Sequence, residues 1–134
     1  MLKTTILEAS VEFIAQPFAV PLVLSSGPIT ECTEARASVA VEVDGKRAAG
    51  RGAIYLSDLW SWPDASLSHQ RRDAALREYC QAISGNLRQF CGGAPAHPLE
   101  LGMRLHEAVA CGMGFQPESG QPENLRHGQD ARAT

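Results

Sequence analysis

Residues 29–56 read ITECTEARASVAVEVDGKRAAGRGAIYL, and this stretch decides the fold. Small apolar residues alternate with polar ones up to Val43, which predicts a half-buried β-strand, because successive side chains of a strand point to opposite faces. Asp44 and Gly45 then form a dipeptide typical of a two-residue hairpin turn. The chain therefore returns as a second strand over residues 46–56. The small residues at 48, 49, 50, 52 and 53 predict that another segment packs closely over this return strand.

A further strand precedes this hairpin, because apolar residues alternate with polar ones from Leu7 to Ala15. Pro17 and Pro21 then each remove a backbone donor, and a cluster of Ser, Gly and Pro follows at residues 25–28. We expect residues 16–28 to form a long loop, and loops of that length usually carry function or lack order.

The second half of the chain has helical periodicity. Apolar residues recur at three- and four-residue spacing, with arginines 71, 72 and 77 placed elsewhere on the helical wheel; the recurring residues are Leu76, Tyr79, Cys80, Ile83, Leu87, Phe90 and Cys91. Asp64, Ser66 and Ser68 are candidate N-caps, and Gly85 marks a possible break. A second helix is expected over residues 99–113. The predicted fold class is α+β: a three-stranded antiparallel meander followed by two or three helices.

The length of 134 residues suits one domain and is too short for a complete (β/α)₈ barrel. We place the domain at residues 1–114. Residues 115–134 have no aromatic after Phe115 and a single large aliphatic, Leu125, so they are expected to form a disordered tail that is not native to the domain.

Composition excludes several classes of function. Twelve Lys and Arg against fifteen Asp and Glu leave a formal net charge of −3, and without a basic block we expect no nucleic-acid partner. The longest apolar run is too short to cross a bilayer, and the N-terminal residues do not form a secretory leader. A soluble, cytoplasmic protein with four reduced cysteines is expected.

The sequence contains few residues that by themselves suggest catalysis or metal binding. His106 lacks the second histidine of a zinc-protease motif, so it is expected to be a solvated or partner-facing helix residue. His69 would oppose the helix dipole if protonated and is expected in a loop or on the surface, while His97 and His127 have no evident partners. Asp58 is the best isolated carboxylate, although capping a turn is its simpler role. We therefore predict no catalytic residue and no metal ligand.

Two loops, residues 17–28 and 55–63, flank the predicted hairpin at the same end. One carries the hydroxyls of Ser25 and Ser26, and the other carries Trp60 and Trp62. Together they are suited to covering a ligand pocket or an interface. The alternative is that the two tryptophans close the bottom of the core.

Three segments resemble a known family: PLVLSSGPITECTEARASVAVEVDG at residues 21–45, GRGAIYLSDLWSWPD at 50–64 and HPLELGMRLHEAV at 97–109. They are similar to the N-terminal capping domain of the mandelate racemase and muconate-lactonizing enzyme branch of the enolase superfamily, and the resemblance covers about residues 6–113. It implies a domain that covers a barrel, with two loops that close over a small acid. Ser25, Ser26, Leu59 and Trp60 are the substrate-binding residues that it implies.

In that superfamily a Lys or His base removes a proton beside a carboxylate, and Mg²⁺ stabilises the enediolate. The family includes racemases, epimerases, dehydratases and cycloisomerases, and its bases and metal ligands belong to the barrel. Because residues after Phe115 do not resemble the first barrel strand, the resemblance implies a truncated capping domain that holds no cofactor and is inactive alone. Its expected partner is the missing barrel, or a second copy associating through the exposed barrel-facing surface.

Two other hypotheses stay open. The chain is either a free-standing module that binds a small acid or a protein, with a homodimer through its sheet as one form, or one chain of a split enzyme whose barrel is a separate polypeptide.

Overall fold

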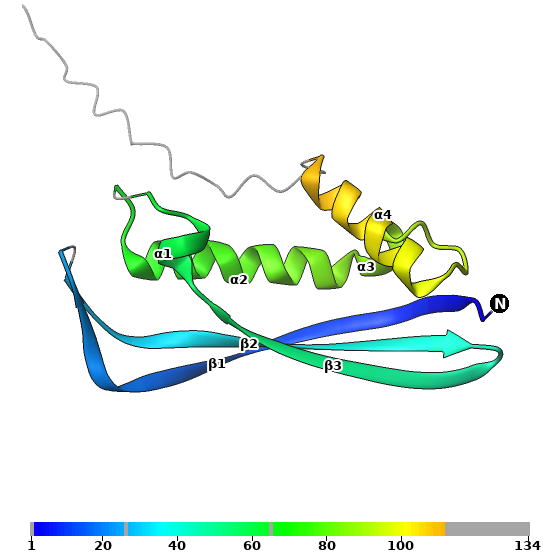
Figure 1. Cartoon of the computed structure of the whole chain (residues 1–134), viewed down its shortest axis with the longest axis horizontal. Helices are drawn as coiled ribbons and strands as arrows, with labels where there is room; N and C mark the ends of the chain where they lie inside the picture. Colours follow the sequence, from blue (N-terminus) through cyan, green and yellow to red (C-terminus); the bar gives the residue numbers. More distant parts are fainter. Residues whose placement is uncertain (1, 26, 65, 112–134) are drawn as a thin grey trace, which may run out of the picture.

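The computed structural model describes residues 2–25, 27–64 and 66–111. The element order is β1 (Thr4–Leu24), β2 (Gly27–Val43), β3 (Lys46–Leu56), α1 (Asp58–Ser61), α2 (His69–Gly85), α3 (Leu87–Phe90) and α4 (Pro98–Ala110). The strands form one antiparallel sheet in the order β1-β2-β3, and the helices lie on one side of it (Figure 1). The predicted α+β meander followed by helices is confirmed. The predicted tail at residues 115–134 lies outside the described residues.

The turn between β2 and β3 follows from its two residues. Asp44 has a φ of 50° and Gly45 a φ of 74°, so both adopt the left-handed conformation that a type I′ turn requires. Val43 pairs with Lys46 directly across the turn, and the register continues unbroken to Thr33 and Leu56.

The loop expected at residues 16–28 is wrong, because β1 continues through both prolines to Leu24 and β2 begins at Gly27. Pro17 pairs with Glu31, and the register then shifts before Leu22, which pairs with Ile29. Pro21 falls within this irregularity. β1 is an edge strand, and on its open side backbone N–H groups face solvent. A proline at such a position removes no hydrogen bond of the sheet. The predicted meander already places this strand at an edge, so the error was to treat the prolines as the end of the strand.

The helices cover parts of β1 and β2 but leave β3 exposed from Lys46 to Tyr55; only Leu56 at its end is buried. Phe13, Ala35 and Ile54 are cross-strand neighbours and share one face of the sheet. Arg77 of α2 lies over the Phe13 ring, with its guanidinium carbon 5.6 Å from the ring centroid. Ala35 is 5% exposed, whereas Ile54 is 68% exposed. The expectation that a segment packs closely over β3 is therefore wrong within the described residues: a Cβ added at Gly50 or Gly52 would meet no atom within 4 Å.

Glycines divide the helical region. α2 ends at Gly85, so the break that its sequence suggested is real, and α3 follows as a single turn. Gly92 and Gly93 both have positive φ and turn the chain toward α4. His97 caps α4 by accepting a hydrogen bond from the backbone N–H of Leu99, at 3.2 Å, so the view that it has no partner is wrong.

A small core holds α3 and α4 against the start of the sheet. Cys91, Ala96 and Leu101 form its buried cluster, and Ala96 exchanges backbone hydrogen bonds of 2.9 and 3.1 Å with Thr4 of β1. No helix in the described part of the chain is long and apolar enough to span a membrane.

Candidate functional site

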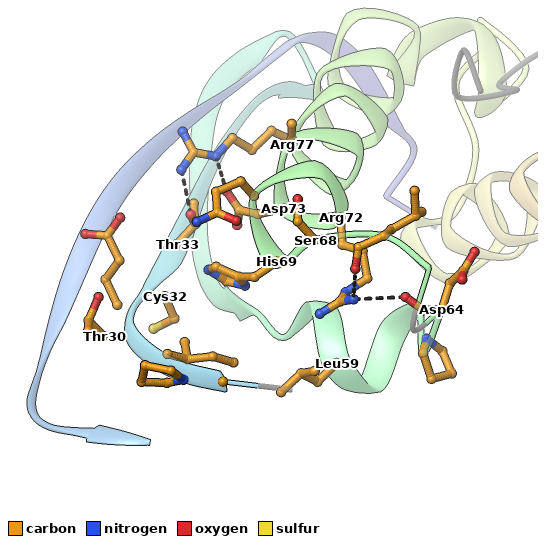
Figure 2. A pocket seen from close by; sticks show the side chains of 18 of the residues that line it. Thr30, Cys32, Thr33, Leu59, Asp64, Ser68, His69, Arg72, Asp73 and Arg77 are labelled. Carbon is orange, nitrogen blue, oxygen red and sulfur yellow. Dashed lines mark hydrogen bonds and ion pairs between the residues drawn. The ribbon is translucent and has the colours of Figure 1, made fainter. Parts of the chain in front are cut away.

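A cavity of about 950 Å³ lies between the start of β2 and the N-terminal half of α2 (Figure 2). Its walls come from both segments that the sequence placed at the same end of the hairpin. Residues 27–33 form one wall, and Leu59, Pro63 and the start of α2 form the other. The volume is at the upper end of the range typical of small-molecule sites.

The structure brings only some of the four predicted substrate-binding residues to this cavity. Ser25 and Leu59 line it. Trp60 does not, because it projects from α1 with 87% of its surface exposed, so it does not close the core either. Ser26 lies outside the described residues. Residues 55–63 are also not a simple loop: β3 runs through Leu56, and residues 58–61 form the single turn of α1.

Asp58 is the centre of a charged cluster whose other members, His69 and Arg72, line the cavity. Its Oδ2 accepts a hydrogen bond from Arg72 Nε at 2.9 Å, and its Oδ1 lies 2.9 Å from His69 Nδ1. The residue is 4% exposed and Arg72 is 6% exposed. Asp58 thus joins α1 to α2 instead of capping a turn, and His69 is a partly buried, paired residue rather than the loop or surface histidine that was expected.

Arg72 also fastens the segment that leads into α2. Its Nη1 donates to the carbonyl oxygens of Asp64, at 2.9 Å, and Leu67, at 2.5 Å. Ser68 caps the helix by accepting from the backbone N–H of Arg71 at 3.2 Å, which settles the choice among the three candidate caps. Asp64 instead forms a local turn with Ser66, whose N–H and hydroxyl both donate to it and lower the pKa of the Asp64 carboxyl.

A second ion pair on α2 joins Asp73, the residue after Arg72, to Arg77 one helical turn further on. Arg77 donates to Asp73 Oδ2 at 2.8 Å and to the Thr33 hydroxyl of β2 at 2.7 Å. Asp73 is 8% exposed, and its Oδ1 is buried without a hydrogen-bond partner among the described residues. These contacts hold the middle of α2 to the sheet and form the other end of the cavity wall.

Cys32 also lines the cavity but is a poor nucleophile. Burial raises the pKa of its thiol, and the carboxylates of Asp73, Glu34 and Glu31 raise it further. A raised pKa keeps the thiol protonated at neutral pH, and the thiolate is the reactive form. Cys32 therefore contributes a neutral, polarisable thiol to the cavity wall.

Arg72 is the residue that sequence reasoning missed, since it was placed with the solvated arginines on the wheel. Its position held a signal: residues 72, 76, 79, 83 and 87 share one helical stripe, and all but Arg72 are apolar or aromatic. A charged residue that continues a buried stripe needs a buried partner of opposite charge. Asp58 supplies it.

The described residues do not suit the Mg²⁺ that the resemblance implies for a full-length enzyme. They contain no group of three His, Cys, Asp or Glu side chains placed to hold a metal ion, and both oxygens of Asp58 are already engaged. Comparisons with family models, with curated proteins and with solved structures found no match to this chain.

Proposed function

We propose that this chain is a capping domain of the mandelate racemase and muconate-lactonizing enzyme type, and that other residues supply the barrel with its base and metal. By this proposal the domain closes one side of a substrate site and is inactive without the barrel. The main support is the cavity, because Ser25 and Leu59, two of the four residues that the resemblance assigns to the substrate, line it together.

Exposed apolar side chains at the same end of the molecule also support a lid. Val20 and Val23 lie near the tip of the β1–β2 hairpin and are 77% and 78% exposed. The tip and α1, which carries Trp60, lie toward the same end of the sheet (Figure 1). Clusters of large exposed apolar residues on a folded domain usually mark a surface that another protein unit covers.

Complementation tests the capping role. The purified chain is mixed with a barrel domain of this superfamily whose own cap has been deleted, in the presence of Mg²⁺, and racemisation or dehydration of carboxylic acids is followed. Activity that needs both components supports the proposal. Turnover by this chain alone, retained after an unrelated purification route, would overturn it. The coding sequence on both sides of this region, read in all frames, is a second check, and absence of any barrel-like sequence counts against a lost barrel.

A free-standing binding module is the second candidate, and one observation favours it: the cavity has a volume of about 950 Å³, within the range typical of small-molecule sites. Saturable binding of a small acid by the isolated chain, weakened by Leu59→Ala and unchanged by Leu99→Ala, supports this role. Leu99 is a matched control because it is exposed on α4 and is not among the residues that line the cavity. Co-purification with a larger chain rich in acidic metal ligands would instead identify a split enzyme.

A further inference from the structure

β3 is one of the two edge strands of the sheet, and it lacks the features that usually protect an edge. The other edge strand, β1, contains Pro17 and Pro21 and has two register shifts against β2. β3 contains no proline and pairs with β2 over its whole length without a shift. Prolines, bulges and short length normally prevent another strand from pairing with an edge. β3 is therefore the edge that an additional strand can join.

The register of β3 shows which of its backbone groups are free. Val43 and Lys46 close the two-residue turn, so they form a hydrogen-bonded pair, and such pairs alternate with non-hydrogen-bonded pairs along an antiparallel ladder. The even-numbered residues of β3 therefore bond to β2. The odd-numbered residues 47, 49, 51, 53 and 55 direct their N–H and C=O groups away from β2, and no described segment outside the sheet bonds to them. We call these five residues the open edge.

There is room beside the open edge for the side chains of an added strand. Every residue of β3 from Lys46 to Tyr55 is exposed. Gly50, Gly52 and Ile54 alternate along the helix-bearing face of the sheet, and the space over both glycines is empty. Apolar side chains of a neighbouring strand can therefore lie over the two glycines and against Ile54, which is the kind of cross-strand contact that stabilises a sheet.

The charge of β3 favours one kind of partner. Its charged residues are Lys46, Arg47 and Arg51, and it contains no acid. Arg47 has Glu42 as its cross-strand neighbour and an exposed pair of 3.6 Å with Glu8, whereas Lys46 and Arg51 form no ion pair with a described residue. A second copy of β3 would add three more cations at this edge, and like charges on neighbouring strands are destabilising. An acidic strand would instead be attracted.

We propose that β3 binds an extended acidic segment of another protein as a fourth strand of the sheet. Backbone hydrogen bonds to the open edge supply affinity, and side chains on the two faces supply specificity. Acidic residues of the partner lie beside Arg47 and Arg51, which share one face, and apolar residues alternate with them on the other face, over Gly50, Gly52 and Ile54. No residue of β3 lines the cavity, so this interaction surface is independent of the proposed capping function.

The test uses the isolated chain and a fluorescein-labelled nonapeptide in which Glu and Val alternate. Fluorescence anisotropy measures affinity, and amide hydrogen exchange followed by NMR locates the peptide. With free peptide at about ten times its Kd, the amides of the open edge should exchange about tenfold more slowly, because the unbound fraction falls by that factor. The even-numbered amides already bond to β2 and should change little. A peptide of alternating Lys and Val should not bind, nor should the Glu–Val peptide methylated at every backbone nitrogen, which has no donors.

Variants of β3 separate strand addition from general attraction to a basic surface. Arg51→Glu should weaken binding about three- to tenfold, because a cross-strand attraction becomes a repulsion. Arg71→Glu, the matched charge reversal at an exposed arginine of α2, should leave the affinity unchanged. Ala49→Pro should abolish binding and keep the fold, because the N–H that it removes lies on the open edge. If this variant does not fold, the methylated peptide tests the same hydrogen bonds in the unmodified chain.

Four results would overturn the proposal. They are absence of Glu–Val peptide binding at about 1 mM, equal binding of the methylated peptide, protection confined to other segments, and self-association without peptide that protects the same amides. The last result would assign the open edge to a second copy. Because complementation with a barrel is a separate measurement, each of these results leaves the capping role to be judged independently.

Discussion

Replacing Asp58 by Asn tests whether the charged cluster holds the candidate site together. The side chains of Asp58 and Arg72 are 5% and 7% exposed, and their ion pair has an N–O distance of 2.9 Å. Asn keeps the shape but removes the negative charge, which leaves Arg72 buried without a counter-ion. Loss of one partner from a buried pair costs roughly 3–5 kcal/mol.

The lower end of that range applies here, because Arg72 keeps its hydrogen bonds to two backbone carbonyls and Asn can still accept one. We therefore expect Asp58→Asn to lower the free energy of unfolding by about 3 kcal/mol. For a domain of this size that corresponds to a fall in melting temperature of roughly 10 to 20 °C. Urea unfolding followed by tryptophan fluorescence measures it directly, since Trp60 and Trp62 adjoin Asp58 in sequence.

Glu8→Gln is the matched control. The pair between Glu8 and Arg47 has an N–O distance of 3.6 Å, and both side chains are more than two-thirds exposed. Its loss should change the free energy of unfolding by less than about 0.5 kcal/mol. If Asp58→Asn has an effect as small as the Glu8 control, the cluster does not stabilise the fold and the reasoning from burial is refuted.

Three further measurements test other parts of the structure. Because burial raises the pKa of Cys32, iodoacetamide should label this thiol much more slowly at mildly alkaline pH in the folded chain than in urea. Equal labelling rates, measured by peptide mass mapping, would contradict a buried Cys32. A hydrogen bond from Arg36 lowers the pKa of Glu34 in the folded chain. The stability that the Glu34 carboxylate contributes is therefore present above about pH 4.3, the usual pKa of Glu in an unfolded chain, and is lost as the pH falls through the lower folded pKa. Glu34→Gln should therefore lose less stability than the parent between neutral and acidic pH in urea titrations, and parallel losses would rule this out. Gly45→Ala should destabilise the chain by about 1 kcal/mol, because Gly45 has a φ of 74°. Gly50→Ala is the control and should be neutral or slightly stabilising, because Gly50 lies in extended backbone with open space around it. Equal effects of the two substitutions on the urea midpoint would contradict the assigned turn.

Sequence patterns predicted the features that depend on near neighbours. Alternation and the Asp44–Gly45 dipeptide were enough to predict the β2–β3 hairpin, and helical spacing predicted α2 together with its break at Gly85. These features follow from backbone geometry and from residues within a few positions of each other, so a linear sequence contains the necessary information.

Tertiary structure alone decided how far β1 and β2 extend, which face of β3 stays exposed and where the buried cluster lies. Prolines break a central strand but are tolerated in β1 because it pairs on one side only, a property of strand order. Asp58 and Arg72 are fourteen positions apart, and their burial depends on how α1 packs against α2. Whether a charged side chain is solvated or buried depends on which distant segment covers it, and this is why the cavity and the buried pair of Asp58 and Arg72 became visible only once the chain was folded.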